Sequence, residues 1–466
     1  MTDFLFQYHA VSPTTWAYLS SLLMIGLFFK FNRFFSIRNV DLVLLIALAP
    51  GLLFVHSGNS LQQHAANGTQ GNEDMESGRI DVPTSVEGAQ DPSSKSQSAV
   101  ELGKRLEGWG YFWLLGTGAL WMIRLLVDTA MVRRPLLAPN LTVGGLTFIG
   151  FFLFIFLTVN VIAMRPLAAS GQAVSSASSE TGPGTRMDVM LDYQQGMGPG
   201  YTALRALSTG ALKTVLILAH LATIVAVILV GYRHFGNINN GIAAATLYLM
   251  LPYTSLMTGR IDHVLPAALL VWTIVFYRRP LFAGLFLGCA CGCVYYPFFL
   301  LPLWVSFYWK RGLWRFSASV IVALFVMAGL LGAVRGNASL VSDLQRMFGL
   351  LKPQMEELEG IWNLGIGGWD PVFRLPVLAV FVALSGTMAI WPPRKDLGTL
   401  LSCGAALMLA SQFWHGFGGG LYIAWYLPLL LLAIFRPNLE DRVAEAVLDD
   451  AWIPRRLGRT VVANEV

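Results

Sequence analysis

Apolar segments of roughly the length needed to cross a lipid bilayer recur along almost the whole chain of 466 residues. A membrane-spanning helix needs about 20 mostly apolar residues, and about thirteen segments approach or reach that length. Inside a bilayer, backbone polar groups have no water to bind, so such segments must form helices or a closed barrel. The segments lie near residues 14–29, 41–55, 109–127, 142–163, 211–231, 241–257, 264–277, 281–296, 297–309, 316–334, 373–391, 397–414 and 420–435. The sequence therefore predicts an all-α, polytopic membrane helix bundle with 12–13 transmembrane segments.

Composition supports a membrane protein and argues against a nucleic-acid partner. The chain is 55% hydrophobic and only 13% charged, whereas soluble domains carry about 25% charged residues. Its mean hydropathy is +0.58. The net charge of +5 is explained by Lys and Arg in short loops, which set the orientation of membrane proteins. We expect a multi-pass protein of a bacterial cytoplasmic membrane, surrounded by membrane lipids and without nucleic acid.

Short basic loops predict which ends of the segments face the cytoplasm. One assignment makes every one of them cytoplasmic, namely 30–38, 133–135, 277–280, 309–315 and 392–396. The same assignment defines three regions. Residues 1–140 form N-terminal helices with a polar external loop at 56–107. Residues 141–437 form a core with external loops at 164–210 and 335–370, and residues 438–466 form a cytoplasmic tail.

The two early external loops differ in character. Residues 56–107 are polar, acidic and rich in turn formers, which predicts a disordered or loosely packed loop. The second half of residues 164–210 reads "TRMDVMLDYQQGMGPGYTALRAL". Its spaced acids, aromatic residues and Pro-Gly turn favour a more structured segment.

An ionisable cluster interrupts the apolar sequence at "TGRIDHVLPAALL", residues 258–270. A water-exposed turn carries polar residues of any kind, so Arg260, Asp262 and His263 are explained equally well by exposure. The functional interpretation is a phosphate clamp, because Arg presents a fixed fork of donors and anionic headgroups lie at this depth. In that interpretation Arg260 and His263 face the phosphate, and Asp262 orients them.

The sequence after this turn resembles a known pattern. The external turn opens a helix that ends in "YRRP"; a Gly-rich "AGLFLG" helix, a break at "YYPFF" and a further basic turn follow. This resembles the C-type (GT-C) superfamily of integral-membrane glycosyltransferases, especially the polyprenol-phosphate-mannose-dependent mannosyltransferases. Their turn reads roughly Gly-Gln-x-Asn, where this chain has Arg260 and Asp262. Their Lys-x-x-Pro is replaced at the break by Tyr295 or a neighbour, which leaves open how a lipid phosphate would be held there.

A second stretch, "WHGFGGGLYIAWYLPLLLLAIFRP" at 414–437, is similar to the external His-and-aromatic turn that closes many members of the superfamily. His415 and Tyr422 are the matching positions. With Tyr295, they are the residues that the resemblance assigns to an acceptor or lipid cavity. Together the two matching stretches cover less than a fifth of the chain.

The resemblance implies an enzyme that moves a sugar from a polyprenyl-phosphate donor to a lipid or glycan acceptor at the external face. Such a transfer needs a carboxylate to take the acceptor proton opposite the departing phosphate. The resemblance places it in an early external loop, where Asp192 is the first candidate and Asp188 the second. They are four residues apart and would share a helical face. No metal or cofactor is expected. The alternatives are a secondary transporter or a non-catalytic polytopic protein of envelope biogenesis.

Four expectations concern structure alone. Arg124 and Asp128 have the i,i+4 spacing of a structural ion pair, and His220 is expected to hydrogen-bond between helices. "CACGC" (289–293) is expected to ease helix contact through small residues rather than bind metal. Pro297 predicts that residues 281–309 form two short helices that turn back midway.

Overall fold

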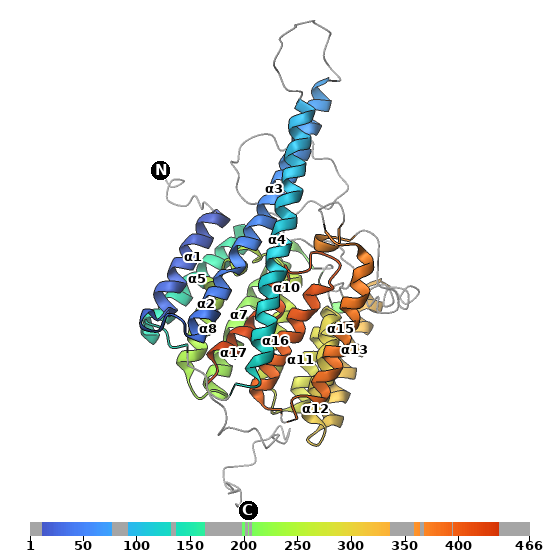
Figure 1. Ribbon diagram of the computed structural model, residues 1–466. Helices are drawn as coiled ribbons and strands as arrows, with labels where there is room; N and C mark the ends of the chain where they lie inside the picture. Colours follow the sequence, from blue (N-terminus) through green and yellow to red (C-terminus); the bar gives the residue numbers. More distant parts are fainter. Residues whose placement is uncertain are drawn as a thin grey trace, which may run out of the picture.

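The computed structural model describes residues 12–76, 92–131, 137–163, 198–200, 204, 207–335, 358–363, 368–393 and 395–437. These residues form a bundle of helices without a β-strand (Figure 1). Each helix is bounded as follows: α1 Pro13–Phe28, α2 Ile37–Ile46, α3 Leu48–Glu76, α4 Pro92–Asp128, α5 Val143–Ala163, α7 Thr209–Arg233, α8 Ile238–Met250, α9 Pro252–Leu256, α10 Ile261–Val275, α11 Pro280–Cys293, α12 Leu301–Tyr308, α13 Leu313–Arg335, α15 Arg374–Ile390, α16 Leu397–Ala410 and α17 Leu427–Phe435. Short 3₁₀ turns occupy Phe31–Arg33 (η1), Tyr296–Leu300 (η2), Gly360–Trp362 (η4), Pro371–Phe373 (η6), Ser411–Phe413 (η7) and Ile423–Trp425 (η8).

Six segments are long and apolar enough to cross a membrane, which supports the predicted class of helical membrane protein. They are Ile37–Gln63, Ser96–Asp128, Val143–Ala163, Thr209–Arg233, Leu313–Ala333 and Pro371–Ile390. Shorter apolar helices, such as Ile261–Val275 and Leu397–Phe413, lie among them. Much of the difference from the expected 12–13 segments comes from these short helices.

Capping side chains mark where several helices begin. Ser12 accepts a hydrogen bond from the backbone N–H of Thr15 at the start of α1, and Ser208 accepts one from Ala211 at the start of α7. Asp396 accepts one from Thr399 at 2.7 Å at the start of α16. Each satisfies an N–H that has no partner within its helix.

The segment expected to be a loose external loop is instead mostly a helical hairpin. The helix α3 continues to Glu76 and α4 begins at Pro92, and the two project together from one end of the bundle (Figure 1). Glycines let the helices meet. A Cβ on Gly58 would lie 2.6 Å from the Gly103 carbonyl oxygen, and one on Gly110 would lie 2.8 Å from that of Gly51. The prediction of a disordered or loosely packed loop is therefore wrong for the described parts of 56–107.

The Gly-rich helix α11 lies directly against α13. A Cβ on Gly288 would meet the Val320 carbonyl at 2.9 Å, and one on Gly284 would overlap that of Phe316. All four cysteines are free thiols. Within "CACGC", a Cβ on Gly292 would lie 2.8 Å from Met327 Cγ of α13, so the expectation that small residues ease helix contact is confirmed there. The predicted pair of short helices is also confirmed, because α11 ends at Cys293 and α12 begins at Leu301 after a 3₁₀ turn.

The short basic loops gather at the other end of the bundle. The Tyr308 hydroxyl donates to the Tyr277 carbonyl at 2.5 Å, and the Ser306 hydroxyl donates to the Ala389 carbonyl at 2.5 Å. Lys395 also donates to Ala389 at 3.1 Å. These bonds bring the loops around 277–280, 309–315 and 392–396 together, as the predicted alternation requires of these three loops. The basic loop at 133–135 lies outside the described residues.

Candidate functional site

The ionisable turn lies inside the bundle. His220, near the middle of α7, contacts the Thr258 carbonyl through Nε2 and the Tyr248 hydroxyl through Nδ1, both at 3.2 Å. This confirms the expected interhelical hydrogen bonding of His220. Because His220 is 11 residues from the start of α7, the turn lies about 16 Å along that helix at 1.5 Å per residue. The site is therefore recessed from the N-terminal end of α7.

Arg260 and Asp262 form a two-contact ion pair at the start of α10. The Arg260 Nε and Nη2 donate to the two Asp262 carboxylate oxygens at 3.0 and 2.8 Å. Trp425 Nε1 donates to the Asp262 backbone carbonyl at 3.0 Å, which ties this turn to the C-terminal stretch. The Asp262 side chain is 1% exposed and that of Arg260 is 21% exposed. The alternative of a freely exposed polar turn is wrong, because Arg260 alone among residues 258–263 is more than slightly exposed.

His263 faces inward, not toward the outer surface. Its Nδ1 lies 2.6 Å from the Tyr253 hydroxyl, and its Nε2 lies 3.6 Å from the nearer Asp262 oxygen without a hydrogen bond. The side chain is 2% exposed. In this conformation Asp262 orients Arg260 as expected, whereas the hydrogen bond of His263 goes to Tyr253. Only Arg260 is placed to contact a phosphate from outside. The expected place of His263 on the phosphate-facing rim is corrected accordingly.

A column of rings connects the two sequence stretches. The ring centroid of Tyr422 lies 4.4 Å from that of His263 and 4.5 Å from that of His415. The column continues from His415 to Tyr296 at 4.8 Å and from Tyr296 to Tyr295 at 4.1 Å. The candidate cavity residues Tyr295, His415 and Tyr422 thus join the candidate phosphate residues in one aromatic cluster.

The loop that carries His415 and Tyr422 is held by two polar side chains. Gln412 Oε1 accepts hydrogen bonds from the backbone N–H groups of Gly420 and Tyr422, both at 3.2 Å. Arg374, a buried cation at the start of α15, donates through Nε and Nη2 to the Trp414 carbonyl at 3.1 Å. Gly420, at φ 102°, supplies a backbone conformation that other residues rarely adopt. The loop is thereby fixed over the start of α10.

His415 is a neutral imidazole in this setting. Its Nδ1 accepts a hydrogen bond from the Phe417 backbone N–H at 3.1 Å, which leaves Nε2 as the protonated nitrogen. Burial, together with the positive charge of Arg374, lowers the pKa of His415 to about 3. Burial also raises the pKa of the Tyr422 hydroxyl, with Asp262 adding to the effect. Both rings therefore offer polar atoms without net charge at neutral pH.

The hairpin contributes an outer rim to the site. Tyr111 of α4 packs against two loop glycines: a Cβ on Gly360 would lie 3.2 Å from its ring, and one on Gly418 would lie 3.4 Å from its hydroxyl oxygen. Glu107 and Glu359 both lie close enough to influence this hydroxyl electrostatically. The sequence did not point to Tyr111, Glu107 or Glu359. For Glu359 the only local signal was an acid followed by a glycine and then an aromatic residue in "LEGIW", residues 358–362.

Asp188 and Asp192 lie outside the described residues. The described end of their loop is anchored beside the aromatic cluster, since the Gly198 backbone N–H donates to the Cys293 carbonyl at 2.7 Å. Gly198 is buried there. A Cβ on Gly200 would lie 3.2 Å from the Cys293 sulfur, so residues 198–200 pack on the end of α11, two residues before Tyr295.

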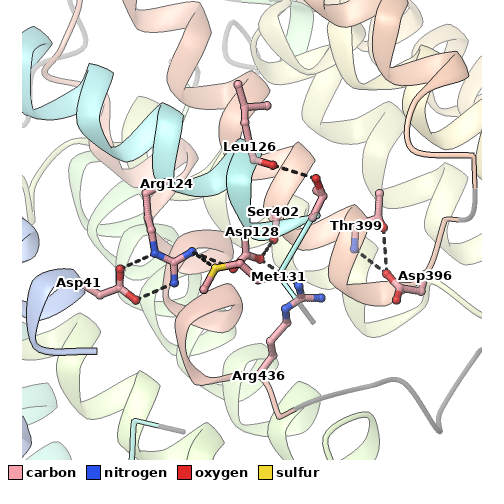
Figure 2. Close-up of polar contacts among 10 residues, drawn as sticks. Asp41, Arg124, Leu126, Asp128, Met131, Asp396, Thr399, Ser402 and Arg436 are labelled. Atoms are coloured by element: carbon pink, nitrogen blue, oxygen red, sulfur yellow. Dashed lines mark hydrogen bonds and ion pairs between the residues drawn. The ribbon is translucent and has the colours of Figure 1, made fainter. Parts of the chain in front are cut away.

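A second polar cluster lies at the basic-loop end (Figure 2). Arg124 binds both Asp41 oxygens at 2.7 and 2.9 Å and Asp128 at 2.9 Å. Asp128 also accepts from Arg436 at 2.9 Å and from the Ser402 hydroxyl. The expected Arg124–Asp128 ion pair is confirmed as part of this larger network. It joins α2, α4, α16 and the residue after α17, and the small pocket beside it has room for about one water.

Within the described ranges, no three His, Cys, Asp or Glu side chains gather as metal ligands would. Comparisons with protein-family models, curated proteins and solved structures found no match.

Proposed function

We propose that this chain is a membrane glycosyltransferase that moves a sugar from a polyprenyl-phosphate donor to a lipid or glycan acceptor at the external membrane face. The observation that carries the proposal is the meeting of two distant sequence stretches. The stretches 259–316 and 414–437 each resemble C-type glycosyltransferases. In the fold they form one cluster, through the Trp425–Asp262 bond and the Tyr422–His263 contact.

Arg260 is the residue proposed to bind the donor phosphate. The Asp262 carboxylate fixes its guanidinium through two hydrogen bonds, so little conformational freedom is lost when an anion binds. A phosphate that approaches from the exposed side would meet a preoriented cation next to aromatic rings and neutral hydroxyls. Such an arrangement suits a leaving group that gains negative charge during transfer.

Asp192 and Asp188 are proposed as carboxylates of the same site. Their loop ends at Gly198, which is fixed near Tyr295. Asp192 is six residues earlier, and six residues span at most about 20 Å of extended chain. Asp192 can therefore lie no more than about 20 Å from Gly198, which makes its distance from Arg260 a direct check on the assignment.

The transporter alternative receives less support from the described residues. A transporter places unpaired or switchable charges near the middle of its spans. Here Asp41, Arg124, Asp128 and Arg436 form mutual ion pairs at one end of the bundle. They join helices rather than line a path.

The test is sugar transfer by the purified protein in liposomes supplied with radiolabelled polyprenyl-phosphate sugars, mannose first, and with extracted lipid and glycan acceptors. Arg260→Lys keeps the charge next to Asp262 but loses the fork of donors. We expect its kcat/KM for the donor to fall roughly tenfold to a hundredfold, the range for charge-assisted hydrogen bonds. Arg278→Lys, at the opposite end, is the matched control. The proposal fails if the unmodified protein transfers no sugar from any donor, or if both variants behave alike.

A further inference from the structure

We infer that Glu359 is the general base of this transfer, the group that takes the proton of the acceptor hydroxyl. The inference rests on the proposed function and changes its assignment of residues, since the sequence pointed to Asp192 and Asp188. It comes from a contact network at the outer rim of the site that the sequence did not suggest.

The backbone places Glu359 beside the loop of His415. Its N–H donates to the Gly416 carbonyl at 2.9 Å. The next residue, Gly360, adopts a φ of 71° and lies under the Tyr111 ring. The main chain is thus held from both sides, while the Glu359 side chain is exposed. A carboxylate fixed at its backbone and open to the outside can reach a bound acceptor.

Glu359 and Arg260 lie near the same two hydroxyl groups. Both act electrostatically on the Tyr111 hydroxyl and on the Tyr422 hydroxyl. A carboxylate and the proposed donor-binding cation therefore share one small set of polar groups. An inverting displacement needs both a base for the acceptor and a cation for the leaving phosphate.

Glu107, the other carboxylate near this rim, is not placed for the same role. It is 8% exposed and accepts a hydrogen bond from Gln62 Nε2 at 2.8 Å. Its side chain thus belongs to the contact between α3 and α4. Of the two rim carboxylates, Glu359 is the exposed one.

In the proposed transfer, the acceptor hydroxyl gives its proton to the Glu359 carboxylate while its oxygen forms a bond to the anomeric carbon. The bond from that carbon to the phosphate oxygen breaks, and its electron pair leaves with the polyprenyl phosphate. Arg260 stabilises the added negative charge on the phosphate. Protonated Glu359 then releases its proton to water.

Rescue by azide tests the role of Glu359 as a base. Azide is an anionic nucleophile and needs no base, so it replaces the acceptor when the base is missing. In the liposome assay we expect Glu359→Gln to lower kcat roughly 10²- to 10⁴-fold. Glu359→Ala with sodium azide should form the glycosyl azide of inverted anomeric configuration. Glu101→Gln, an exposed acid of α4, should transfer sugar normally, and Asp192→Ala should give no azide product.

Each other outcome has a defined meaning. If Asp192→Ala forms the glycosyl azide and Glu359→Ala does not, the base is Asp192; the inference is overturned and the proposed function stands. If Glu359→Gln retains full activity, the inference is also overturned. If the unmodified protein transfers no sugar, the proposed function itself fails. Thermal unfolding of each variant in detergent separates loss of fold from loss of chemistry, because the Glu359–Gly416 backbone bond does not need the side chain.

Discussion

His415 shows how burial sets the charge of a residue at this site. The ring is 3% exposed, and its pKa is lowered from 6.5 to about 3 by burial and by Arg374. The folded protein therefore keeps His415 neutral where the unfolded chain takes up a proton. The contribution of His415 to the free energy of unfolding is therefore fully present above pH 6.5. This contribution decreases as the pH falls from 6.5 toward 3, by at most roughly 1.4 kcal/mol per pH unit.

We predict that His415→Gln flattens the acid side of the stability profile. Gln can accept a backbone hydrogen bond but does not titrate. Thermal unfolding in detergent between pH 7.5 and 4.5 measures the effect, with the melting temperature of each variant compared with its own value at pH 7.5. A Gln variant whose melting temperature falls with acid as steeply as that of the unmodified protein would show that His415 does not contribute to acid sensitivity.

Single residues were predictable where the sequence itself placed them side by side. The Arg260–Asp262 pair follows from spacing at the start of a helix, and the residues of the "WHGFGGGLY" turn were recognisable by type. Tyr111 and Glu359 were not predictable, because their roles depend on a contact between segments about 250 residues apart. The inward orientation of His263 was missed for the same reason, since Tyr253 and Tyr422 decide it.

At the scale of elements, the hairpin formed by α3 and α4 is the main difference from the sequence prediction. Polar composition suggested disorder, since it offers little apolar area to bury. The structure instead brings the backbones together at small residues. Gly51 and Gly58 are seven residues apart, as are Gly103 and Gly110, which is the repeat of two helices that wind about each other. The signal was present in glycine spacing rather than in hydropathy.

We predict that Gly58→Ala lowers the melting temperature, whereas Gly26→Ala does not. The added Cβ at position 58 would lie 2.6 Å from a backbone oxygen and 2.8 Å from a backbone nitrogen, neither of which can move aside independently. Overpacking of this kind costs roughly 1–3 kcal/mol. Nothing lies within 4 Å of a Cβ at Gly26, where Ala should be neutral or slightly stabilising because of its helix propensity.

Fluorescence-detected size-exclusion chromatography after heating compares the two glycine variants directly. The close packing of α3 on α4 would be contradicted if Gly58→Ala melted at or above the temperature of Gly26→Ala.

The break between α11 and α12 was predictable because its cause is local. Pro297 removes a backbone donor, which interrupts the helix. The contact between α11 and α13 also has a local cause, because the Gly-rich face of α11 has no side chains to keep α13 away. Elements defined by their own residues were thus predicted well. Elements that depend on a partner, such as the hairpin, were not.

For the whole molecule, polar interactions concentrate at two places that differ in kind. The recessed site holds neutral rings beside the Arg260–Asp262 ion pair, whose cation is partly exposed, an arrangement suited to binding an anion. The basic-loop end holds a closed network of two acids and two arginines (Figure 2). Because this network joins the first third of the chain to the residue after α17, it is expected to fix the bundle as a whole and not to act in chemistry.

The last prediction tests that division of roles. Asp128→Asn leaves Arg124 and Arg436 with less compensating charge in a buried setting, and breaking a buried ion pair costs roughly 3–5 kcal/mol. Arg436→Gln leaves Asp128 with Arg124 and Ser402 as partners, so its cost should be smaller. The double variant should be more stable than the sum of the two single effects predicts, because the residues are in direct contact. Unfolding in detergent measures all three variants, with Ser208→Ala as a control that removes only the cap of α7, worth about 1 kcal/mol. If the single effects added without coupling, Asp128 and Arg436 would not act as a pair. If the variants instead unfolded normally but lost sugar transfer, the network would have a part in function that its closed geometry does not suggest.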